Sequence, residues 1–382
     1  MHFHLTEEQA AIQETALTFA KERIAPFAGE WDESEYFPVD VIKETARLGM
    51  AAIYVRAEQG GSGLSRLDGA LIFEALAYGC PTISSYISIH NMVAWMVGKL
   101  GTEAQVAAWM PKLASMEWLS SYCLTEPGAG SDAAALKARA ERAGDYYILN
   151  GTKQFISGAG ATDLYFIFAR TGREDPGGIS AFVVLKDTPG LSFGAKEKKM
   201  GWNAQPTRQV ILDNARVPAA NLVGGVEGQG FKLAMSGLDG GRINIGACSL
   251  GAAWAALDKA RQYLLERKAF GKNLADFQAL QFKIADMATD LEAARLMVYR
   301  GADALDRADP QATMYSAMAK RCATDLGFKI CNEALQIHGG YGYLKDFGLE
   351  KLVRDLRVHQ ILEGTNEIMR VVISRRLLGG NR

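Results

Sequence analysis

The spacing of apolar residues changes twice along this chain, and that change limits the folds open to it. In the last third, apolar residues recur every three or four positions, which is the spacing of a buried helix face; the clearest run is Ile284, Met287, Leu291, Ala294 and Val298. The first third shows the same periodicity. In the middle third the period falls to two, as in strands that bury one face. The sequence therefore predicts a mainly α protein with a central β domain.

The expected strands are short and are separated by turns rich in Gly, Pro and Asp. They cover 145–157, 164–170, 179–186 and 207–217. Within the first range, Asn150-Gly151 is typical of a tight hairpin turn, so we expect two strands around it. We place the domain boundaries to give a helical domain, a β domain and a helical bundle, over 1–120, 121–222 and 223–382.

The first helix has a clear beginning. Thr6 and Gln9 have the spacing of a capping box, in which each side chain accepts a hydrogen bond from the backbone of the other residue. We expect the helix to run from there to about Ala25.

Composition excludes several classes of function. The formal net charge is −1, which favours neither nucleic acid nor an anionic membrane. The five cysteines are scattered and form no CxxC, so we expect reduced thiols and no metal site. No run of about 18 apolar residues could span a membrane. The amino terminus resembles neither a signal peptide nor a transit segment, so we expect a bacterial cytoplasmic protein or a mature mitochondrial matrix chain.

One carboxylate near the carboxyl end has the surroundings of a general base. Glu363 precedes Gly364, where the backbone can pass close to a ligand, and Thr365, which is a good N-cap for the helix that follows. A carboxylate beside free backbone N–H groups suits proton abstraction, since the N–H groups can receive the negative charge that forms. A solvated residue that pairs with the helix dipole is the alternative.

A glycine-rich segment lies before the β domain. Gly128-x-Gly130-x-x-Ala133 has the spacing of a dinucleotide fingerprint, but Pro127 interrupts the step from strand to turn and no βαβ unit surrounds it. We therefore reject a Rossmann fold. The hydroxyls of Thr125 and Ser131 could still line a polar ring system, and a plain loop is the alternative.

Two further segments combine groups that bind phosphate. Arg267, Phe270, Phe277 and Gln278 bring together a cation, aromatic rings and an amide, which suit a pyrophosphate and an adenine. The glycine turn 336–342 offers backbone N–H groups to phosphates. A solvated Arg with core Phe residues is the alternative for the first segment, and we expect His338 to pack or to hydrogen-bond and not to act as a base.

A glycine pair interrupts the helical pattern of the last third. Gly240 and Gly241 each cost about 1 kcal/mol relative to Ala inside a helix, so we expect a ligand or another helix to lie against that face. The neighbouring Arg242 could hold a polar ligand group or form an ion pair.

Three of these motifs together resemble the acyl-CoA dehydrogenase flavoproteins. They are Thr125-Glu-Pro-Gly-x-Gly-Ser-Asp132, then Asn150-Gly-x-Lys-x-Phe-Ile-Ser157, then Glu363-Gly-Thr365. The resemblance covers essentially the whole chain in the family's order. It implies an N-terminal helical domain, a middle β-barrel-like domain and a C-terminal four-helix bundle, with FAD between the last two and acyl-CoA as the substrate.

The resemblance also implies residue roles. Glu363 would be the catalytic base. The implied FAD contacts are Tyr122, Cys123, Leu124, Thr125, Ser131, Phe155, Ile156, Ser157, Arg267, Phe270, Phe277, Gln278, Gln336, Ile337, His338, Gly339, Gly340, Thr365, Asn366 and Glu367. The implied substrate contacts are Ser131, Asp239, Gly240, Gly241, Arg242 and Arg375. Some relatives carry their base directly before the Arg at position 242, where this chain has Gly241.

The implied reaction is α,β-dehydrogenation of an acyl-CoA. Leu362, where many straight-chain relatives have Tyr, together with 86–92, 249–253, 336–346 and 357–364, resembles members that oxidise isobutyryl-CoA to methacrylyl-CoA in valine breakdown. A short-chain or 2-methylbutyryl-CoA dehydrogenase is the alternative. An acyl-CoA oxidase and a non-enzymatic CoA-binding helical scaffold are more distant ones. The resemblance further implies a homotetramer and an electron-transferring flavoprotein as the electron acceptor.

Overall fold

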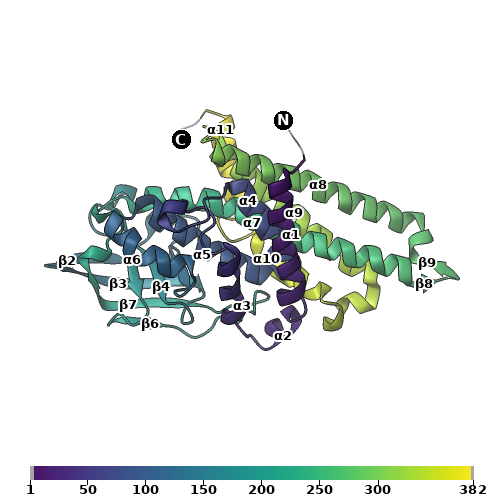
Figure 1. Ribbon diagram of the computed structural model, residues 1–382, viewed down its shortest axis with the longest axis horizontal. Helices are drawn as coiled ribbons and strands as arrows, with labels where there is room; N and C mark the ends of the chain where they lie inside the picture. Colours follow the sequence, from purple (N-terminus) through teal and green to yellow (C-terminus); the bar gives the residue numbers. More distant parts are fainter. Residues whose placement is uncertain (1–3, 380–382) are drawn as a thin grey trace.

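The computed structural model describes residues 4–379 and places a β domain at one end of an elongated, otherwise helical molecule (Figure 1). The amino-terminal helices are α1 (Glu7–Phe19), α2 (Ala28–Glu33), α3 (Val39–Glu44), α4 (Arg66–Gly79), α5 (Pro81–Leu100) and α6 (Glu103–Ala114). The carboxyl-terminal helices are α7 (Gly230–Glu266), α8 (Gln278–Asp306), α9 (Ala312–His338), α10 (Leu349–His359) and α11 (Asn366–Leu377). The mainly α fold with a central β domain is confirmed.

The first helix begins as expected. The Thr6 side chain accepts from the Gln9 N–H at 3.2 Å, and the Gln9 side chain accepts from the Thr6 N–H at 3.1 Å. Beyond Phe19 the chain continues as a π-helical turn, Ala20–Ile24, before it bends toward α2.

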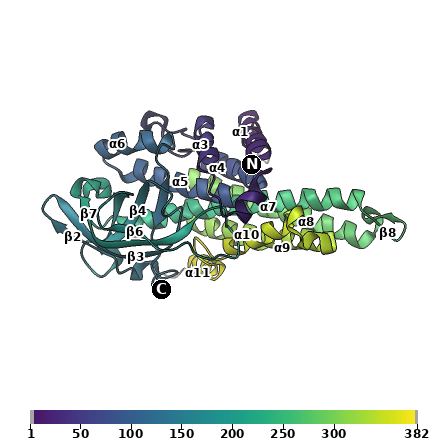
Figure 2. The same cartoon turned by 90° about the horizontal axis from the view of Figure 1, so that it is seen from below.

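The β domain is a seven-stranded sheet. It lies between the two helical parts in the sequence, and it forms one end of the molecule in space (Figure 2). Its strands are β1 (Ser120–Cys123), β2 (Arg139–Ala143), β3 (Tyr146–Ser157), β4 (Leu164–Arg170), β5 (Ile179–Leu185), β6 (Leu191–Phe193) and β7 (Thr207–Pro218). The order is β1-β4-β2-β3-β7-β6, with β5 paired to β4. Since β4 is buried along its whole length, it forms the centre of the domain. The strands expected at 164–170, 179–186 and 207–217 are present.

The hairpin expected at Asn150-Gly151 is wrong. Both residues lie inside β3, at a bulge in its pairing with β7, and the chain reverses earlier, at Gly144 between β2 and β3. The glycine is needed for a different reason: its φ is 143°, and a Cβ there would lie 2.7 Å from the Ala138 Cβ. The dipeptide therefore marks a close approach between strands, which sequence spacing alone does not distinguish from a turn.

The carboxyl-terminal bundle buries the stripe that periodicity predicted. Met287, Leu291, Ala294 and Val298 on α8 are buried, and Ile284 is half-buried. The long helix α7 runs unbroken through Gly240 and Gly241 and packs against α9, α8 and α4. A small hairpin of β8 (Lys268–Ala269) and β9 (Lys272–Asn273) joins α7 to α8 at the end of the molecule opposite the β domain. Across residues 4–379, no helix is long and apolar enough to cross a membrane.

A buried ion pair ties the segment after β1 to β3. Lys153 Nζ lies 2.7 Å from Glu126 Oε1 and also donates to the Leu124 carbonyl oxygen. The Glu126 carboxylate in turn accepts the backbone N–H groups of Lys137 and Ala138, at 2.6 and 2.9 Å. The Gln154 N–H donates to the Thr125 carbonyl oxygen at 2.8 Å, so this pair holds the Thr125 segment beside the end of β3.

Replacing Lys153 with Met should destabilise the protein by about 3–5 kcal/mol, because the Glu126 carboxylate would stay buried without its cation. The loss is measured as a lower urea midpoint by circular dichroism. Arg139→Met is the matched control: Arg139 and Glu174 are 56% and 74% exposed, so we expect a change below about 1 kcal/mol. Equal losses in the two variants would contradict the importance of burial.

Candidate active site

Glu363 lies on a short loop between α10 and α11 in an uncommon backbone conformation. Its φ is 55° and that of the following Gly364 is 93°, so two consecutive residues occupy the left-handed region. For a residue other than Gly this costs roughly 1–3 kcal/mol, and such strain gathers at functional sites. Thr365 ends the loop as the expected N-cap and accepts from the Ile368 N–H at 3.3 Å.

The carboxylate of Glu363 is electrostatically unusual. Its Oε2 atom is buried and has no hydrogen-bond partner within residues 4–379, although the rest of the side chain is partly exposed. Burial raises the pKa of Glu363 to about 7, against the opposing charges of Arg242 and Lys320. The charges of Arg242 and Lys320 do not cancel this shift, so burial is the larger effect. A carboxylate with a pKa near neutrality suits a general base.

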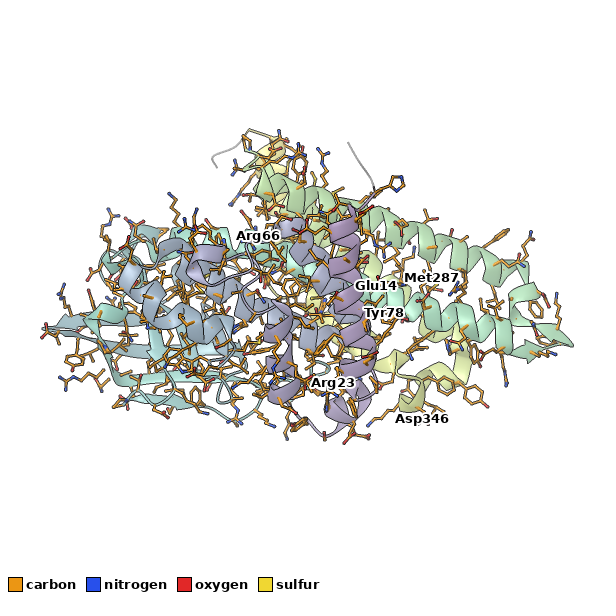
Figure 3. The ribbon with its side chains drawn as sticks, viewed as in Figure 1. Glu14, Arg23, Arg66, Tyr78, Met287 and Asp346 are labelled. Atoms are coloured by element: carbon orange, nitrogen blue, oxygen red, sulfur yellow. The ribbon has the colours of Figure 1, made fainter. Side chains whose placement is uncertain are left out.

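The glycine pair of α7 makes room for this carboxylate. A Cβ on Gly241 would lie 1.9 Å from Glu363 Oε2, and a Cβ on Gly240 would lie 2.4 Å from Arg66 Nη1. Arg66 projects from α4, where the amino-terminal helices meet the bundle (Figure 3). The expectation that another part of the molecule lies against this face is therefore correct, and α7 needs no break to accommodate it.

Arg242 connects α7 to the Glu363 loop. Its Nη1 donates to Asp239 Oδ1 at 2.6 Å, and its Nε points to the Glu363 carbonyl oxygen at 3.5 Å. Thr313 donates to the second Asp239 oxygen at 2.7 Å. The ion pair left open in the sequence is thus present, and it presents a nearly buried cation beside the carboxylate.

The β domain faces the same carboxylate through Tyr122. Its hydroxyl is buried without a partner within the described residues. Burial raises the pKa of Tyr122, and the negative charge of Glu363 raises it further. The ring packs edge-on against Phe168, with centroids 5.3 Å apart. Each domain therefore contributes one buried polar atom that has no hydrogen-bond partner within residues 4–379.

The end of β3 also belongs to this junction. Phe155 has a φ of 58° and is 65% exposed, which is unusual for an aromatic ring within a strand. Ser121 donates to the Ser157 carbonyl oxygen at 2.7 Å, so β1 and the end of β3 lie side by side. An exposed aromatic ring on a strained backbone is a surface on which a planar ring system can stack.

The other residues predicted to contact FAD or substrate differ in how far their side chains are exposed. The side chains of Cys123, Leu124 and Ile156 are buried in hydrophobic clusters, so only their backbone can face a ligand. Asn366 is buried and makes hydrogen bonds inside the protein. Ser131, Glu367 and Arg375 are exposed, as Phe155 is.

A second group of predicted residues meets elsewhere. A pocket of about 410 Å³ is lined by Arg267, Ile337, His338, Gly339 and Gly340, together with Tyr263, Leu274, Tyr341 and Leu344. A Cβ on either glycine would meet nothing within 4 Å, so the backbone there is open to a ligand. The His338 ring stacks on Tyr263, with centroids 4.1 Å apart, as expected for a packing residue.

The remaining residues of this second group are exposed. Phe270 is 95% exposed on the β8–β9 hairpin, and its ring is edge-on to Phe277. Gln278, at the start of α8, and Gln336, near the end of α9, are also exposed. Both views place this hairpin far from the β domain (Figures 1 and 2). One chain therefore does not bring the two groups of predicted cofactor contacts together.

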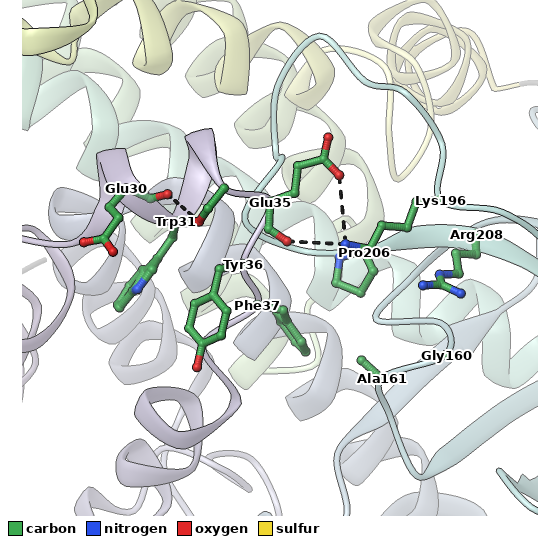
Figure 4. Close-up of a pocket in the computed structure, with 11 residues that line it drawn as sticks. Glu30, Trp31, Glu35, Tyr36, Phe37, Gly160, Ala161, Lys196, Pro206 and Arg208 are labelled. Atoms are coloured by element: carbon green, nitrogen blue, oxygen red, sulfur yellow. Dashed lines mark hydrogen bonds and ion pairs between the residues drawn. The ribbon is translucent and has the colours of Figure 1, made fainter.

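Sequence reasoning missed a third feature, a pocket of about 550 Å³ between the end of α2 and the β domain (Figure 4). Trp31, Phe37 and Arg208 are among its lining residues, and it includes neither Glu363 nor any other predicted site residue. Its residues come from separate stretches of 30–37 and 160–208, so no local motif announces it. Within residues 4–379 no cluster of His, Cys, Asp and Glu could hold a metal ion.

Comparison with known proteins relates nearly the whole chain to one family. Three family models match in order: the acyl-CoA dehydrogenase N-terminal domain over 6–117, the middle domain over 121–215 and the C-terminal domain over 228–378. Mitochondrial isobutyryl-CoA dehydrogenase of Bos taurus is 55% identical over 374 residues, which are 98% of this chain and 90% of that protein.

Solved structures agree with these matches. Butyryl-CoA dehydrogenase from Megasphaera elsdenii superposes with a TM-score of 0.95 at 38% identity, covering 99% of this chain and 100% of that one. PigA in complex with FAD superposes with a TM-score of 0.95 at 29% identity, covering 100% of both chains. The exposed Phe155, the open glycine turn and Arg267 fit a ligand with a planar ring and phosphates. The chain therefore belongs to the acyl-CoA dehydrogenase family, as a flavin-dependent oxidoreductase whose cofactor is FAD.

Proposed function

We propose that this protein converts isobutyryl-CoA to methacrylyl-CoA and that Glu363 removes the α-proton. The buried carboxylate, whose pKa of about 7 is set by burial, carries the assignment of the base. The 55% identity to the bovine isobutyryl-CoA dehydrogenase supports the substrate. Leu362, where many straight-chain relatives have Tyr, supports a short branched acyl group, and valine breakdown is the pathway that we propose for it.

The chain's own groups would lower the barrier in two ways. Before substrate binds, the unpartnered Glu363 Oε2 atom gains nothing from hydrogen bonding, so it keeps its basicity for the α-proton. The Glu363 backbone N–H would donate to the thioester oxygen as negative charge builds there, a contribution of about 3 kcal/mol for such a donor. Arg242 and Asp239 would hold the polar part of the substrate beside the carboxylate. Ser131 and Arg375 remain proposed substrate contacts at the surface.

FAD would lie at the junction of the two domains. Tyr122, Thr125, Phe155 and Ser157 would contact its ring system, and the residues Thr365 to Glu367 would approach it from the bundle. When bound, FAD supplies the two-electron oxidant that takes the β-hydrogen as hydride. We propose that an electron-transferring flavoprotein then accepts the electrons.

The separation of the two groups of cofactor contacts supports an oligomer. Arg267, Phe270 and the glycine turn 336–342 suit a pyrophosphate and an adenine but lie far from Phe155 in the same chain. They would complete the FAD site of a neighbouring subunit. The exposed aromatic rings of Phe270, Tyr341 and Tyr343 give that contact an apolar surface. We propose a homotetramer built on this exchange.

Turnover of a panel of acyl-CoA thioesters, from three to eight acyl carbons, tests the substrate. We expect the highest kcat/KM with isobutyryl-CoA. Butyryl-CoA and 2-methylbutyryl-CoA should be slower but still used, because one methylene in an apolar pocket changes the barrier by about 1–3 kcal/mol. A maximum at hexanoyl-CoA or longer would overturn the branched-chain assignment. Hydrogen peroxide formed at the rate of turnover under air would instead indicate an oxidase.

The pH dependence of kcat/KM tests the base. Glu363 accepts a proton only when ionised, and its pKa in the free enzyme is about 7, so kcat/KM should fall below pH 7 and level off above it. Glu363→Gln should retain the yellow FAD and bind acyl-CoA but lose at least about a hundredfold in kcat. Glu117→Gln is the control, because this carboxylate is 64% exposed and belongs to no proposed site. A Glu363→Gln variant with more than a tenth of normal turnover would remove Glu363 from the role.

Mixing two inactive variants tests the shared cofactor site. Arg267→Ala and Glu363→Gln should each be inactive as pure oligomers. If each site takes its base from one subunit and Arg267 from another, mixed oligomers formed by co-expression contain some intact sites and regain flavin-dependent activity. Co-expression of either variant with the double variant Arg267→Ala/Glu363→Gln is the control and restores nothing. Mixed oligomers with no activity would show that both residues serve the same chain's site.

A further inference from the structure

Lys320 is a buried lysine with no acidic hydrogen-bond partner in the described part of the chain. Its residue is 0% exposed, near the middle of α9. Its Nζ donates to the Gly364 carbonyl oxygen at 2.9 Å and to Asn366 Oδ1 at 2.8 Å. Burying an ammonium group is costly unless it is paired and hydrogen-bonded, so a lysine kept here has a role that an apolar residue could not fill.

The groups that Lys320 holds are those of the strained loop. The left-handed conformation of Glu363 and Gly364 persists only if the surroundings enforce it. Lys320 fixes the Gly364 carbonyl group on one side of the loop. On the other side the Asn366 N–H donates to the Gln360 carbonyl oxygen at 3.0 Å.

Asn366 extends this support into α9. Its Nδ2 donates to Thr324 Oγ1 at 2.9 Å and to Asp325 Oδ1 at 2.7 Å. Gln360, before the loop, donates to the same Asp325 oxygen at 2.9 Å. Hydrogen bonds therefore hold both ends of the Glu363 loop to α9, the helix that also carries Lys320.

Charged groups reach this region from several elements. Around the carboxylate the facing titratable groups are Arg242 and Cys248 on α7, Tyr122 on β1 and Lys320 on α9. Around Lys320 they are Glu363, Asp325, Arg242, Glu367 and His359. Burial lowers the pKa of Lys320, and Glu363 is the largest of the charges that oppose this shift. Burial keeps the neighbouring His359 neutral at physiological pH, since its pKa is lowered to about 3.

We propose that Lys320 is a positioning residue for Glu363: its ammonium group fixes the loop through the Gly364 carbonyl group and Asn366, and its charge favours the ionised carboxylate. This inference rests on the proposed role of Glu363 as the base. It assigns Lys320 no contact with the reacting atoms.

Two substitutions separate the two parts of this role. Lys320→Met removes both the charge and the donor, whereas Lys320→Gln removes the charge but keeps an N–H donor within the loop's surroundings. Lys329→Met is the matched control, because Lys329 lies on the same helix but is 59% exposed and pairs with Asp290 at the surface. The measurements are the pH profile of kcat/KM with isobutyryl-CoA, kcat at the pH plateau, KM, and the visible spectrum of bound FAD.

Both Lys320 variants should shift the acid limb of kcat/KM upward by about 1 pH unit, because loss of a nearby cation raises a carboxyl pKa. Lys320→Met should also lose roughly tenfold in plateau kcat, with KM and the flavin spectrum little changed, and Lys320→Gln should lose less. Lys329→Met should match the unaltered enzyme. If Lys320→Met does not fold, the acid limb of kcat/KM in Lys320→Gln still tests whether the charge of Lys320 favours the ionised carboxylate.

An acid limb that stays in place in both variants, with wild-type plateau kcat, would overturn the proposal. A Lys320→Met variant that only melts at a lower temperature would show a purely structural lysine and would also overturn it. The proposed roles of Glu363 and of Lys320 are contradicted by different results. If Glu363→Gln keeps its activity, the proposed base is wrong; if Glu363→Gln is inactive but the Lys320 variants keep the normal limb, only the role of Lys320 is wrong.

Discussion

The burial of one carboxylate without a hydrogen-bond partner is the constraint around which this molecule is arranged. An isolated buried charge is costly, and Glu363 avoids the full cost because its pKa rises to about 7. The same rise makes the group a stronger base than an exposed carboxylate. Arg242 and Lys320 oppose the rise, so the pKa remains near neutrality and the group can still ionise.

A site between two domains requires that the domains keep a fixed relation, and α10 provides it. The Trp202 N–H donates to Asp355 Oδ1 at 2.6 Å, and its indole N–H donates to His359 Nε2 at 3.2 Å. A Cβ on Gly201 would lie 2.6 Å from the Arg354 backbone, so the loop after β6 lies tightly on the helix. Since His359 is only four residues before Glu363, the β domain and Glu363 are held in register through this contact.

The sequence predicted those features whose cause is local. The stripe from Met287 to Val298 is visible because burial repeats with the period of the helix, whereas the strand at 164–170 is visible as a short continuous apolar run that is buried along its length. Asn150-Gly151 was misleading because its glycine is needed for close contact with Ala138, which lies just before β2. Lys320 was missed because nothing near it in sequence shows that a buried lysine would meet a loop more than 40 residues away. The family resemblance supplied Glu363, but only the fold shows that burial raises its pKa against the charges of Arg242 and Lys320.

The same geometry explains why a carboxylate can occupy only one of two facing positions. Gly241 and Glu363 approach so closely that a Cβ on the glycine would lie 1.9 Å from the carboxylate oxygen. Any side chain at 241 must therefore displace the Glu363 carboxylate or be displaced by it. Gly241 is therefore part of the site. It destabilises α7 by about 1 kcal/mol relative to Ala, but its missing side chain leaves space for the buried carboxylate of Glu363 on the opposite loop. A carboxylate carried at 241 would need a small residue at 363, because both side chains would compete for one volume beside Arg242.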